Sequence, residues 1–291
     1  MYIANLSLQR GFFPNSLKHD SITPVLKSSD CDIESLNSYR PVTTLPFLSK
    51  FLEKAASSQI ISYLESQNLI PLYQSAYLKS HSCETSLFKF TNDVQQMLSE
   101  RKMVILVQLD LSAAFDTVDH AVLLNLLQHK FGISGIALQW FASYLSSRSF
   151  SVKIGSVNGR RVLLIYGVPQ GSILGPLLFI LYIGDLPVIA SKYNISFQSY
   201  ADDSHLYAGF DPLCDYTETM NRVKECFADI EVWMKSNYLE MNVGKTEVLF
   251  IAKPHVHTLF SNMSITLGNE CYVSSQNYTI KSLGAYFNGA M

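Results

Sequence analysis

Apolar residues recur at helical spacing in several separate segments of the chain. Between residues 45 and 68, for example, Leu48, Leu52 and Ala55 are spaced three or four positions apart, and Pro71 follows the segment. Because about 3.6 residues complete one helical turn, this spacing places the apolar side chains on one face. The same pattern predicts helices over residues 45–68, 84–100, 121–131, 135–145 and 216–235.

Shorter apolar runs and alternating segments predict strands. Residues 103–111 (MVILVQLDL) are too few and too rich in β-branched side chains for a helix, so we expect a buried strand there, and another at 247–252. Residues 195–210 alternate on both sides of Ala201-Asp202-Asp203. This pattern predicts a hairpin with two acidic residues at its tip.

A second hairpin is predicted over residues 150–165, where strand-like stretches flank Asn158-Gly159, a dipeptide that suits a type I′ turn. Pro176 is placed to open a short helix that runs to about Tyr182. The first 35 residues show no clear periodicity and are expected to be irregular. The order of elements predicts an α+β fold in which helices back an antiparallel sheet, as in the ferredoxin-like topologies.

Composition excludes some classes of protein. The 291 residues are 48% hydrophobic and 16% charged, which is enough apolar material for a folded core. The net charge of −2 is not that of a generally basic nucleic-acid binder, although residues 101–175 carry seven basic and three acidic side chains. The five cysteines are scattered and fit reduced thiols in an intracellular protein, with the compartment left open. His255 and His257 are interpreted as surface residues rather than metal ligands.

One uncharged segment is long enough to cross a bilayer. Residues 162–184 contain no formal charge. Gly167, Pro169 and Gly171 interrupt this segment, so it is expected to form a strand, a loop and a short helix. No membrane partner is predicted.

Three aspartates stand out because the pattern brings them to the ends of strands. Asp110 ends an apolar strand, and Asp202 and Asp203 lie at a hairpin tip. Grouped carboxylates raise one another's pKa unless a cation offsets their charge. Two Mg²⁺ ions about 3.5–4 Å apart would do so and would support nucleotidyl transfer. On spacing alone, a polar turn at Asp202-Asp203 and a strand cap at Asp110 are the favoured explanation, and Asp116 and Asp119 are expected to cap a helix.

Seven sequence blocks carry a resemblance that periodicity does not show. In chain order they are LNSYRPVTTLPFLSKFLEK (36–54), QSAYLKSHSCETSL (74–87), LDLSAAFDTVDH (109–120), GVPQGSILGPLLF (167–179), YADD (200–203), NVGKTEVL (242–249) and SLGAYF (282–287). Together they resemble the reverse-transcriptase domain of non-LTR (LINE-type) retrotransposons.

The resemblance implies a right-hand polymerase with fingers and palm. It implies an irregular segment at residues 1–35, fingers at 36–100 and a palm with the catalytic site at 101–252. Residues 253–291 would form a primer-grip-like segment that is cut off where a thumb should begin. A thumb and an endonuclease would then belong to a part of the element missing from this chain.

The resemblance also implies roles for individual residues. Asp110, Asp202 and Asp203 would be catalytic and would bind two Mg²⁺ ions, with Mn²⁺ as a substitute, and the carbonyl of Leu111 would complete the metal shell. The implied nucleotide contacts are Arg40, Phe115, Gln170 and Lys245, with Phe115 excluding a ribose 2′-hydroxyl and Lys245 protonating pyrophosphate. The implied template and primer contacts are Arg148, Lys153, Arg160, Arg161 and Gly284.

The implied function is RNA-directed DNA polymerase, with an RNA template, a DNA primer and dNTPs as partners. One departure is that this chain has Gln74-Ser75-Ala76-Tyr77-Leu78 where relatives read QSGFR, so a fingers arginine is missing and Lys79 is its candidate substitute. The main alternative is a catalytically silent nucleic-acid-binding relic. An RNA-dependent RNA polymerase is disfavoured by Phe115, and a cyclic-dinucleotide synthase by the lack of a G-G-[DE]-[DE]-F turn.

Overall fold

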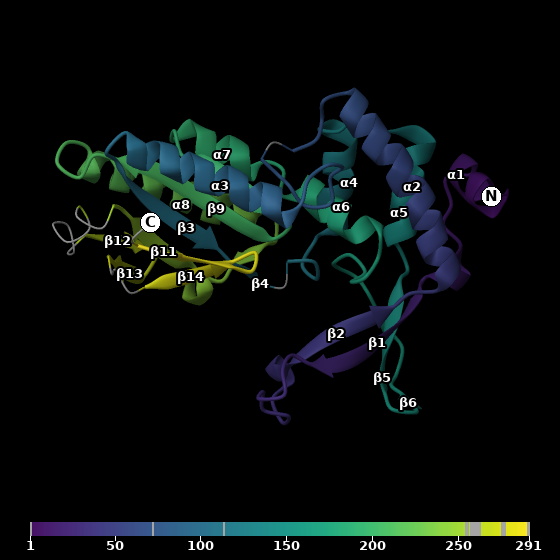
Figure 1. Ribbon diagram of the computed structural model, residues 1–291. Helices are drawn as coiled ribbons and strands as arrows, with labels where there is room; N and C mark the ends of the chain where they lie inside the picture. The colour runs from purple at the N-terminus through teal and green to yellow at the C-terminus, as the bar shows by residue number, and fades with distance from the viewer. Residues whose placement is uncertain are drawn as a thin grey trace. The chain divides into compact units, whose positions relative to one another are not determined.

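The chain folds into two structural units, and each unit is built from two separate segments of the sequence (Figure 1). Unit 1 comprises Met1–Ile70 and Phe115–Tyr182, and unit 2 comprises Pro71–Ala114 and Ile183–Met291. The computed structural model describes residues 2–71, 73–112, 114–253, 256, 263–274 and 278–289. His255 and His257 lie outside these residues, so their predicted surface role stays a prediction.

Unit 2 contains a four-stranded antiparallel sheet with the strand order β11-β3-β9-β8. Every residue from Met103 to Val107 in β3 has no exposed surface. A strand buried on both faces needs apolar residues at successive positions, which explains why this segment does not alternate. The four strands span Glu247–Ile251, Met103–Leu109, Asp203–Phe210 and Ser196–Tyr200, in that order.

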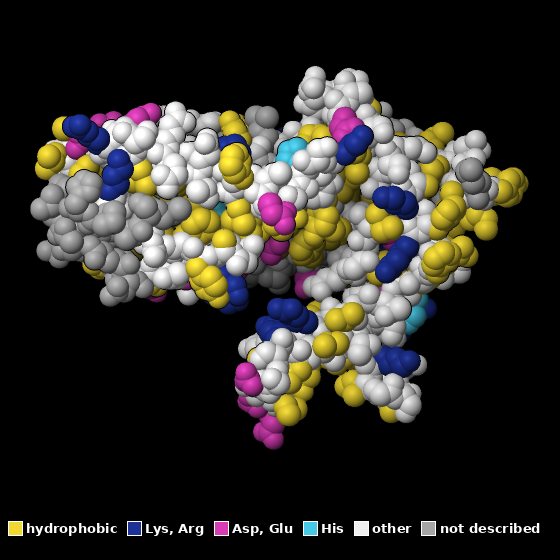
Figure 2. All heavy atoms as spheres, viewed as in Figure 1, with side chains coloured by type: hydrophobic (Ala, Val, Ile, Leu, Met, Phe, Trp, Pro, Cys, Tyr) yellow, Lys and Arg dark blue, Asp and Glu magenta, His cyan; other side chains and the backbone are white. Residues whose placement is uncertain are grey.

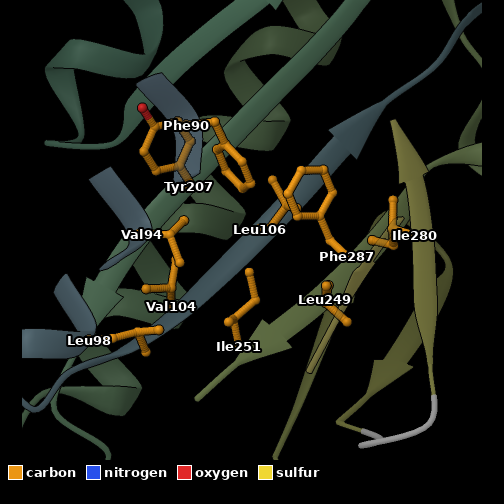
Figure 3. Packing of buried hydrophobic residues seen from close by; sticks show 10 residues of the cluster. All are labelled: Phe90, Val94, Leu98, Val104, Leu106, Tyr207, Leu249, Ile251, Ile280 and Phe287. Carbon is orange, nitrogen blue, oxygen red and sulfur yellow. The ribbon is translucent and has the colours of Figure 1, made fainter. Parts of the chain in front are cut away.

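Helix α3, Cys83–Ser99, packs against this sheet through one continuous core cluster (Figure 3). Val104 and Leu106 of β3 belong to the cluster. Its other buried members are Phe90, Val94, Leu98, Tyr207, Leu249, Ile251, Ile280 and Phe287. Burying one large apolar side chain contributes roughly 1.5–3 kcal/mol, so this cluster holds the strand that ends at Asp110.

Helix α8, Tyr216–Ser236, packs on unit 2 with the apolar stripe that the sequence predicted. The buried stripe residues are Met220, Val223, Phe227, Ile230 and Met234. Helix α7, Leu186–Lys192, contacts both α8 and β8. The remaining elements of unit 2 are β4 (Leu111–Ser112), β10 (Glu240–Met241), the 3₁₀ turn η3 (Val243–Lys245), β12 (Ser264–Leu267), β13 (Glu270–Val273), β14 (Thr279–Ser282) and β15 (Ala285–Asn288).

Unit 1 combines five helices among its described residues with a mixed sheet. The helices are α1 (Tyr2–Gln9), α2 (Phe47–Ser66), α4 (His120–His129), α5 (Gly135–Leu145) and α6 (Leu174–Tyr182). The strands are β1 (His19–Leu26), β2 (Tyr39–Thr44), β5 (Ser149–Ile154), β6 (Val157–Asn158) and β7 (Val162–Leu163), and the 3₁₀ turns are η1 (Asn15–Leu17) and η2 (Leu36–Ser38). Strand β1 pairs antiparallel with β2 and parallel with β5.

Two predictions about unit 1 are wrong. The first 35 residues contain helix α1 and strand β1. Strand β1 pairs with β2, the next strand along the chain, and with β5, 130 positions away, and local periodicity does not reveal such pairing. The hairpin of residues 150–165 does not turn at Asn158-Gly159. The Ile154–Val157 pair closes the turn earlier, at Gly155-Ser156, and Asn158 pairs with Lys153 within the ladder.

Most predicted helices and strands are confirmed. Helix α5 matches the predicted bounds, and α2, α3, α4 and α8 begin and end within two residues of theirs. The hairpin at 195–210 forms as β8 and β9. The apolar stretch Leu174–Lys192 meets the length and hydropathy of a membrane span, but 72% of its window is buried, as in core helices of folded domains, so it is weak evidence for a span.

Candidate active site

The three aspartates come together at one end of the unit 2 sheet. The antiparallel register pairs Leu109 of β3 with Ser204 of β9, so the next residues along the two strands, Asp110 and Asp203, are neighbours. Asp202 lies in the turn between β8 and β9, which the Tyr200–Asp203 pair closes. Residues separated by more than 90 positions in the sequence therefore lie at the same end of the sheet.

The electrostatics of this group show uncompensated negative charge. Burial, followed by the charges of Asp202 and Asp110, raises the pKa of Asp203 to about 6. Partial burial and the charge of Asp110 also raise the pKa of Asp202, although a backbone hydrogen bond opposes the shift. Like charges at close range disfavour ionisation, so a cation would be bound favourably.

The donor set fits a hard divalent cation. Carboxylate oxygens are the ligands that Mg²⁺ prefers, and burial together with neighbouring carboxylate charge raises the pKa values of Asp202 and Asp203. Within the described part of the chain, no group of three or more His, Cys, Asp or Glu side chains is already arranged around a common point as metal ligands.

Asp110 is held by the segment that follows α8. The backbone N–H of Asn242 donates to the carbonyl of Asp110 at 2.9 Å, and β10 pairs with β4 at Leu111 and Met241. Lys245 Nζ lies 3.8 Å from Asp110 Oδ2, with both side chains substantially exposed. This ion pair is too solvated to add much stability, but it places the ammonium group of Lys245 beside the Asp110 carboxylate.

A polar cavity of about 580 Å³ opens beside Asp110. Lys245, Thr246 and Glu247 line it on one side, and Glu270 and Tyr272 of the β12–β13 hairpin line it on the other. Gly284 lies in the turn of the β14–β15 hairpin with φ +84, and open space surrounds its Cα. The structure therefore offers solvent-accessible volume next to Asp110 within unit 2.

Unit 1 carries the loop that contains Gln170. Its side-chain Nε2 donates to both carboxylate oxygens of Asp116, each at 3.1 Å. Val168 N–H donates to the Phe115 carbonyl at 2.8 Å, and the Phe115 ring packs against Phe179 with centroids 4.8 Å apart. Asp116 therefore positions Gln170 and does not cap α4, contrary to the prediction. Asp119 is the cap, because its carboxylate accepts from Val122 N–H at 2.9 Å.

Sequence reasoning missed two buried polar side chains with clear structural roles, Glu53 and Gln74. Glu53 of α2 is fully buried and accepts from the N–H groups of Ile173 and Leu174 at the start of α6. Gln74 is 5% exposed and bonds the turn that carries Asp202. Glu53 occupies the buried stripe of its helix, and this polar residue at an apolar position was the available signal. Gln74 had no comparable local signal.

The predicted phosphate contact at Arg148 is wrong. Its side chain has no exposed surface, and its Nη2 donates to both carboxylate oxygens of Asp20 at 3.2 and 3.0 Å. The guanidinium also lies over the Tyr144 ring, 5.0 Å from the centroid. Burying a guanidinium is favourable only with such partners, so Arg148 is a core residue of unit 1 and is closed to polynucleotide.

The other predicted basic contacts are exposed on the sheet of unit 1. Arg40 lies on β2 and Lys153 on β5, and Arg160 and Arg161 lie between β6 and β7. Arg161 also donates to Ser149 Oγ at 2.7 Å. Figure 2 shows Lys and Arg side chains among exposed hydrophobic ones over this sheet. Their contact with phosphate stays a prediction.

Comparison with known proteins defines the class. The family model described as reverse transcriptase (RNA-dependent DNA polymerase) matches residues 25–287, which is most of the chain. The fold is also similar to that of apo telomerase from Candida tropicalis truncated from the C-terminal domain. That match has a TM-score of 0.56 at 12% identity and covers 81% of this chain and 50% of the other. The chain belongs to the reverse transcriptase family.

Sequence relatives define the branch of the family. The chain is 28% identical over 249 residues to the probable RNA-directed DNA polymerase from transposon BS of Drosophila melanogaster, which covers 84% of this chain and 27% of that protein. It is 30% identical over 203 residues to the probable RNA-directed DNA polymerase from transposon X-element of the same species, covering 69% of this chain and 22% of that protein. These matches confirm the resemblance to non-LTR retrotransposon polymerases. The chain spans about a quarter of the length of these relatives.

Proposed function

We propose that this chain is an RNA-directed DNA polymerase domain that extends a primer 3′-hydroxyl with dNTPs on an RNA template. The observation that carries the proposal is the convergence of Asp110, Asp202 and Asp203 at the end of one sheet. Membership of the reverse transcriptase family supports it. Nucleotidyl transfer through two divalent cations requires a group of carboxylates that holds the cations.

Asp110, Asp202 and Asp203 would hold two Mg²⁺ ions, with Mn²⁺ as a substitute and the Leu111 carbonyl as a further ligand. When bound, these ions lower the pKa of the attacking hydroxyl and offset the charge that develops on the leaving pyrophosphate. Lys245 would deliver a proton to the pyrophosphate, and its place 3.8 Å from Asp110 supports that role.

Unit 1 would supply the contacts to nucleotide and nucleic acid. Phe115 would exclude a ribose 2′-hydroxyl, and Gln170, aligned by Asp116, would contact the incoming nucleotide. Arg40 would contact the triphosphate. The exposed residues Lys153, Arg160 and Arg161 would meet template or primer phosphates, and Gly284 of unit 2 would do so from its hairpin turn.

The polymerase parts follow from the same proposal. The order β11-β3-β9-β8, with α7 and α8 in the connections, is the order of a ferredoxin-like palm and supports that assignment for the parts of residues 101–252 that belong to unit 2. Residues 36–100 would be fingers, and 253–291 would lead toward a thumb.

Primer extension tests the proposal. The purified chain should extend a DNA primer on an RNA template with dNTPs and Mg²⁺, and Asp202→Ala should reduce extension to background. Asp30→Ala, an exposed aspartate in unit 1, is the control and should extend normally. Asp202→Ala should also fold as well as wild type because it removes charge repulsion. Undiminished extension by Asp202→Ala would overturn the proposed site.

A catalytically silent nucleic-acid-binding relic is the second candidate. Leu78 stands where relatives have an arginine that faces the triphosphate, and this loss favours the alternative. A chain that binds primer-template with a steep salt dependence but extends no primer, under conditions in which a complete related polymerase does, would support the relic and refute the polymerase.

A further inference from the structure

The turn that carries Asp202 has a backbone conformation that its sequence does not favour. The Tyr200–Asp203 pair closes a two-residue turn with Ala201 and Asp202 at its centre. Ala201 has φ +57, in the left-handed region where glycine is the usual residue. An alanine keeps this conformation only when surrounding contacts hold it there.

Gln74 supplies those contacts from outside the hairpin. Its Oε1 accepts from the N–H of Ala201 at 3.0 Å and from the N–H of Ala76 at 2.8 Å. Its Nε2 donates to the carbonyl of Ala201 at 3.4 Å and to Ser199 Oγ at 3.2 Å. One amide therefore binds both the donor and the acceptor of the strained residue. A hydroxyl side chain in place of Gln74 would be too short to bind both groups of Ala201, and a carboxylate would have no proton to donate to the Ala201 carbonyl.

The backbone around Gln74 fixes the register of this contact. Ser75 N–H donates to the Ser199 carbonyl at 3.0 Å, and Ser199 N–H donates to the Tyr73 carbonyl at 2.9 Å. These bonds form a short parallel bridge between Gln74 and Ser199 at the open side of β8. Gln74 is 5% exposed, so water does not compete strongly for the amide. All of these residues belong to unit 2.

We propose that Gln74 is a positioning residue for the carboxylates: it holds the Ala201-Asp202 turn in the conformation that presents Asp202 and Asp203 to divalent cations. The part of this inference that concerns cations rests on the proposed function, whereas the part that concerns the turn rests on the contacts of Gln74 alone. Gln74 touches no reacting group and acts only through the backbone of Ala201.

Two variants and a matched control separate positioning from general stability. Gln74→Ala removes all four bonds, and Gln74→Glu keeps the acceptor but loses the donor and adds charge near Asp202. The control is Gln198→Ala. Gln198 is also a buried glutamine of unit 2, 1% exposed on β8, but its Nε2 donates to the carbonyl and hydroxyl of Ser86 in α3 rather than to the turn.

The first measurement is amide hydrogen exchange in the peptide spanning residues 199–204 of the full chain. Gln74→Ala and Gln74→Glu should speed exchange of the Ala201 amide at least about tenfold, as expected when a buried hydrogen bond is lost. In Gln198→Ala the Ala201 amide should exchange at the wild-type rate, even if this variant lowers the melting temperature as much as Gln74→Ala does. Wild-type exchange of the Ala201 amide in Gln74→Ala would overturn the proposal.

The second measurement is Mn²⁺ binding, followed by electron paramagnetic resonance in the absence of nucleic acid. Gln74→Ala should weaken binding about 10- to 100-fold, the range typical of residues that orient metal ligands, and Gln198→Ala should not. Equal weakening by both variants would reduce Gln74 to a stability role and overturn the proposal. If Gln74→Ala speeds exchange at Ala201 but Asp202→Asn binds Mn²⁺ as well as wild type does, the proposed function is refuted and the turn assignment stays intact.

Discussion

Asp203 makes the stability of unit 2 depend on pH in a direction opposite to that of a salt-bridged carboxylate. Burial and the charges of Asp202 and Asp110 raise its pKa from 3.8 to about 6. The folded state therefore binds this proton more tightly than the unfolded state does. Stability from this group is full below about pH 4 and is lost as pH rises from about 4 to about 6.

The magnitude follows from the shift. Two pKa units correspond to roughly 3 kcal/mol at about 1.4 kcal/mol per unit. Because Asp203 is partly exposed, solvent screening reduces this to about 1–2 kcal/mol. Asp203→Asn removes the charge, so at pH 7 we expect the variant to be more stable than wild type by about 1–2 kcal/mol. Near pH 4 the two proteins should be equally stable.

Urea unfolding at several pH values between 4 and 7.5 measures this difference. Adding Mg²⁺ at pH 7 should stabilise wild type and have a smaller effect on Asp203→Asn, because the ion offsets the same repulsion. Asp30→Asn, on an exposed part of unit 1, serves as the control. A difference between wild type and Asp203→Asn that stays constant from pH 4 to 7 would refute the reasoning, as would an Asn variant less stable at pH 7.

Three further predictions concern unit 1. Arg148→Ala should destabilise the protein by about 3–5 kcal/mol in urea unfolding, because it leaves the Asp20 carboxylate buried without its partner; equal stability of variant and wild type would contradict this. Replacing both Arg160 and Arg161 by alanine should instead leave stability nearly unchanged and reduce the slope of log affinity for primer-template against log salt by about 2. Phe115→Ala should relax sugar discrimination in primer extension, raising NTP incorporation relative to dNTP; a variant that rejects ribonucleotides as strongly as wild type would show that the ring serves packing against Phe179.

Much of the candidate site was predictable because its parts have local signals. An apolar run that ends in Asp110 indicates a buried strand, and alternation around Asp202-Asp203 indicates a hairpin. The motif blocks place both among reverse transcriptases, and the family match confirms this. What the local pattern left open was whether these carboxylates meet. The β3–β9 register decides that they do.

The same limits explain the errors. Arg148 lies in a basic stretch of sequence, and a charge count cannot show that Asp20, 128 positions away, neutralises it inside the core. Strand β1 was missed because its pairing with β5, 130 positions away, leaves no local pattern. The role of Gln74 depends on a turn 127 positions further along the chain.

By itself the sequence determined most of the elements and the family of this protein, because helical and strand periodicity and the motif blocks lie within short segments. Only the tertiary structure decided which polar side chains are buried and paired and which face solvent. Burial and pairing depend on contacts between segments more than a hundred residues apart, and the free energy of such contacts leaves no trace in the local pattern.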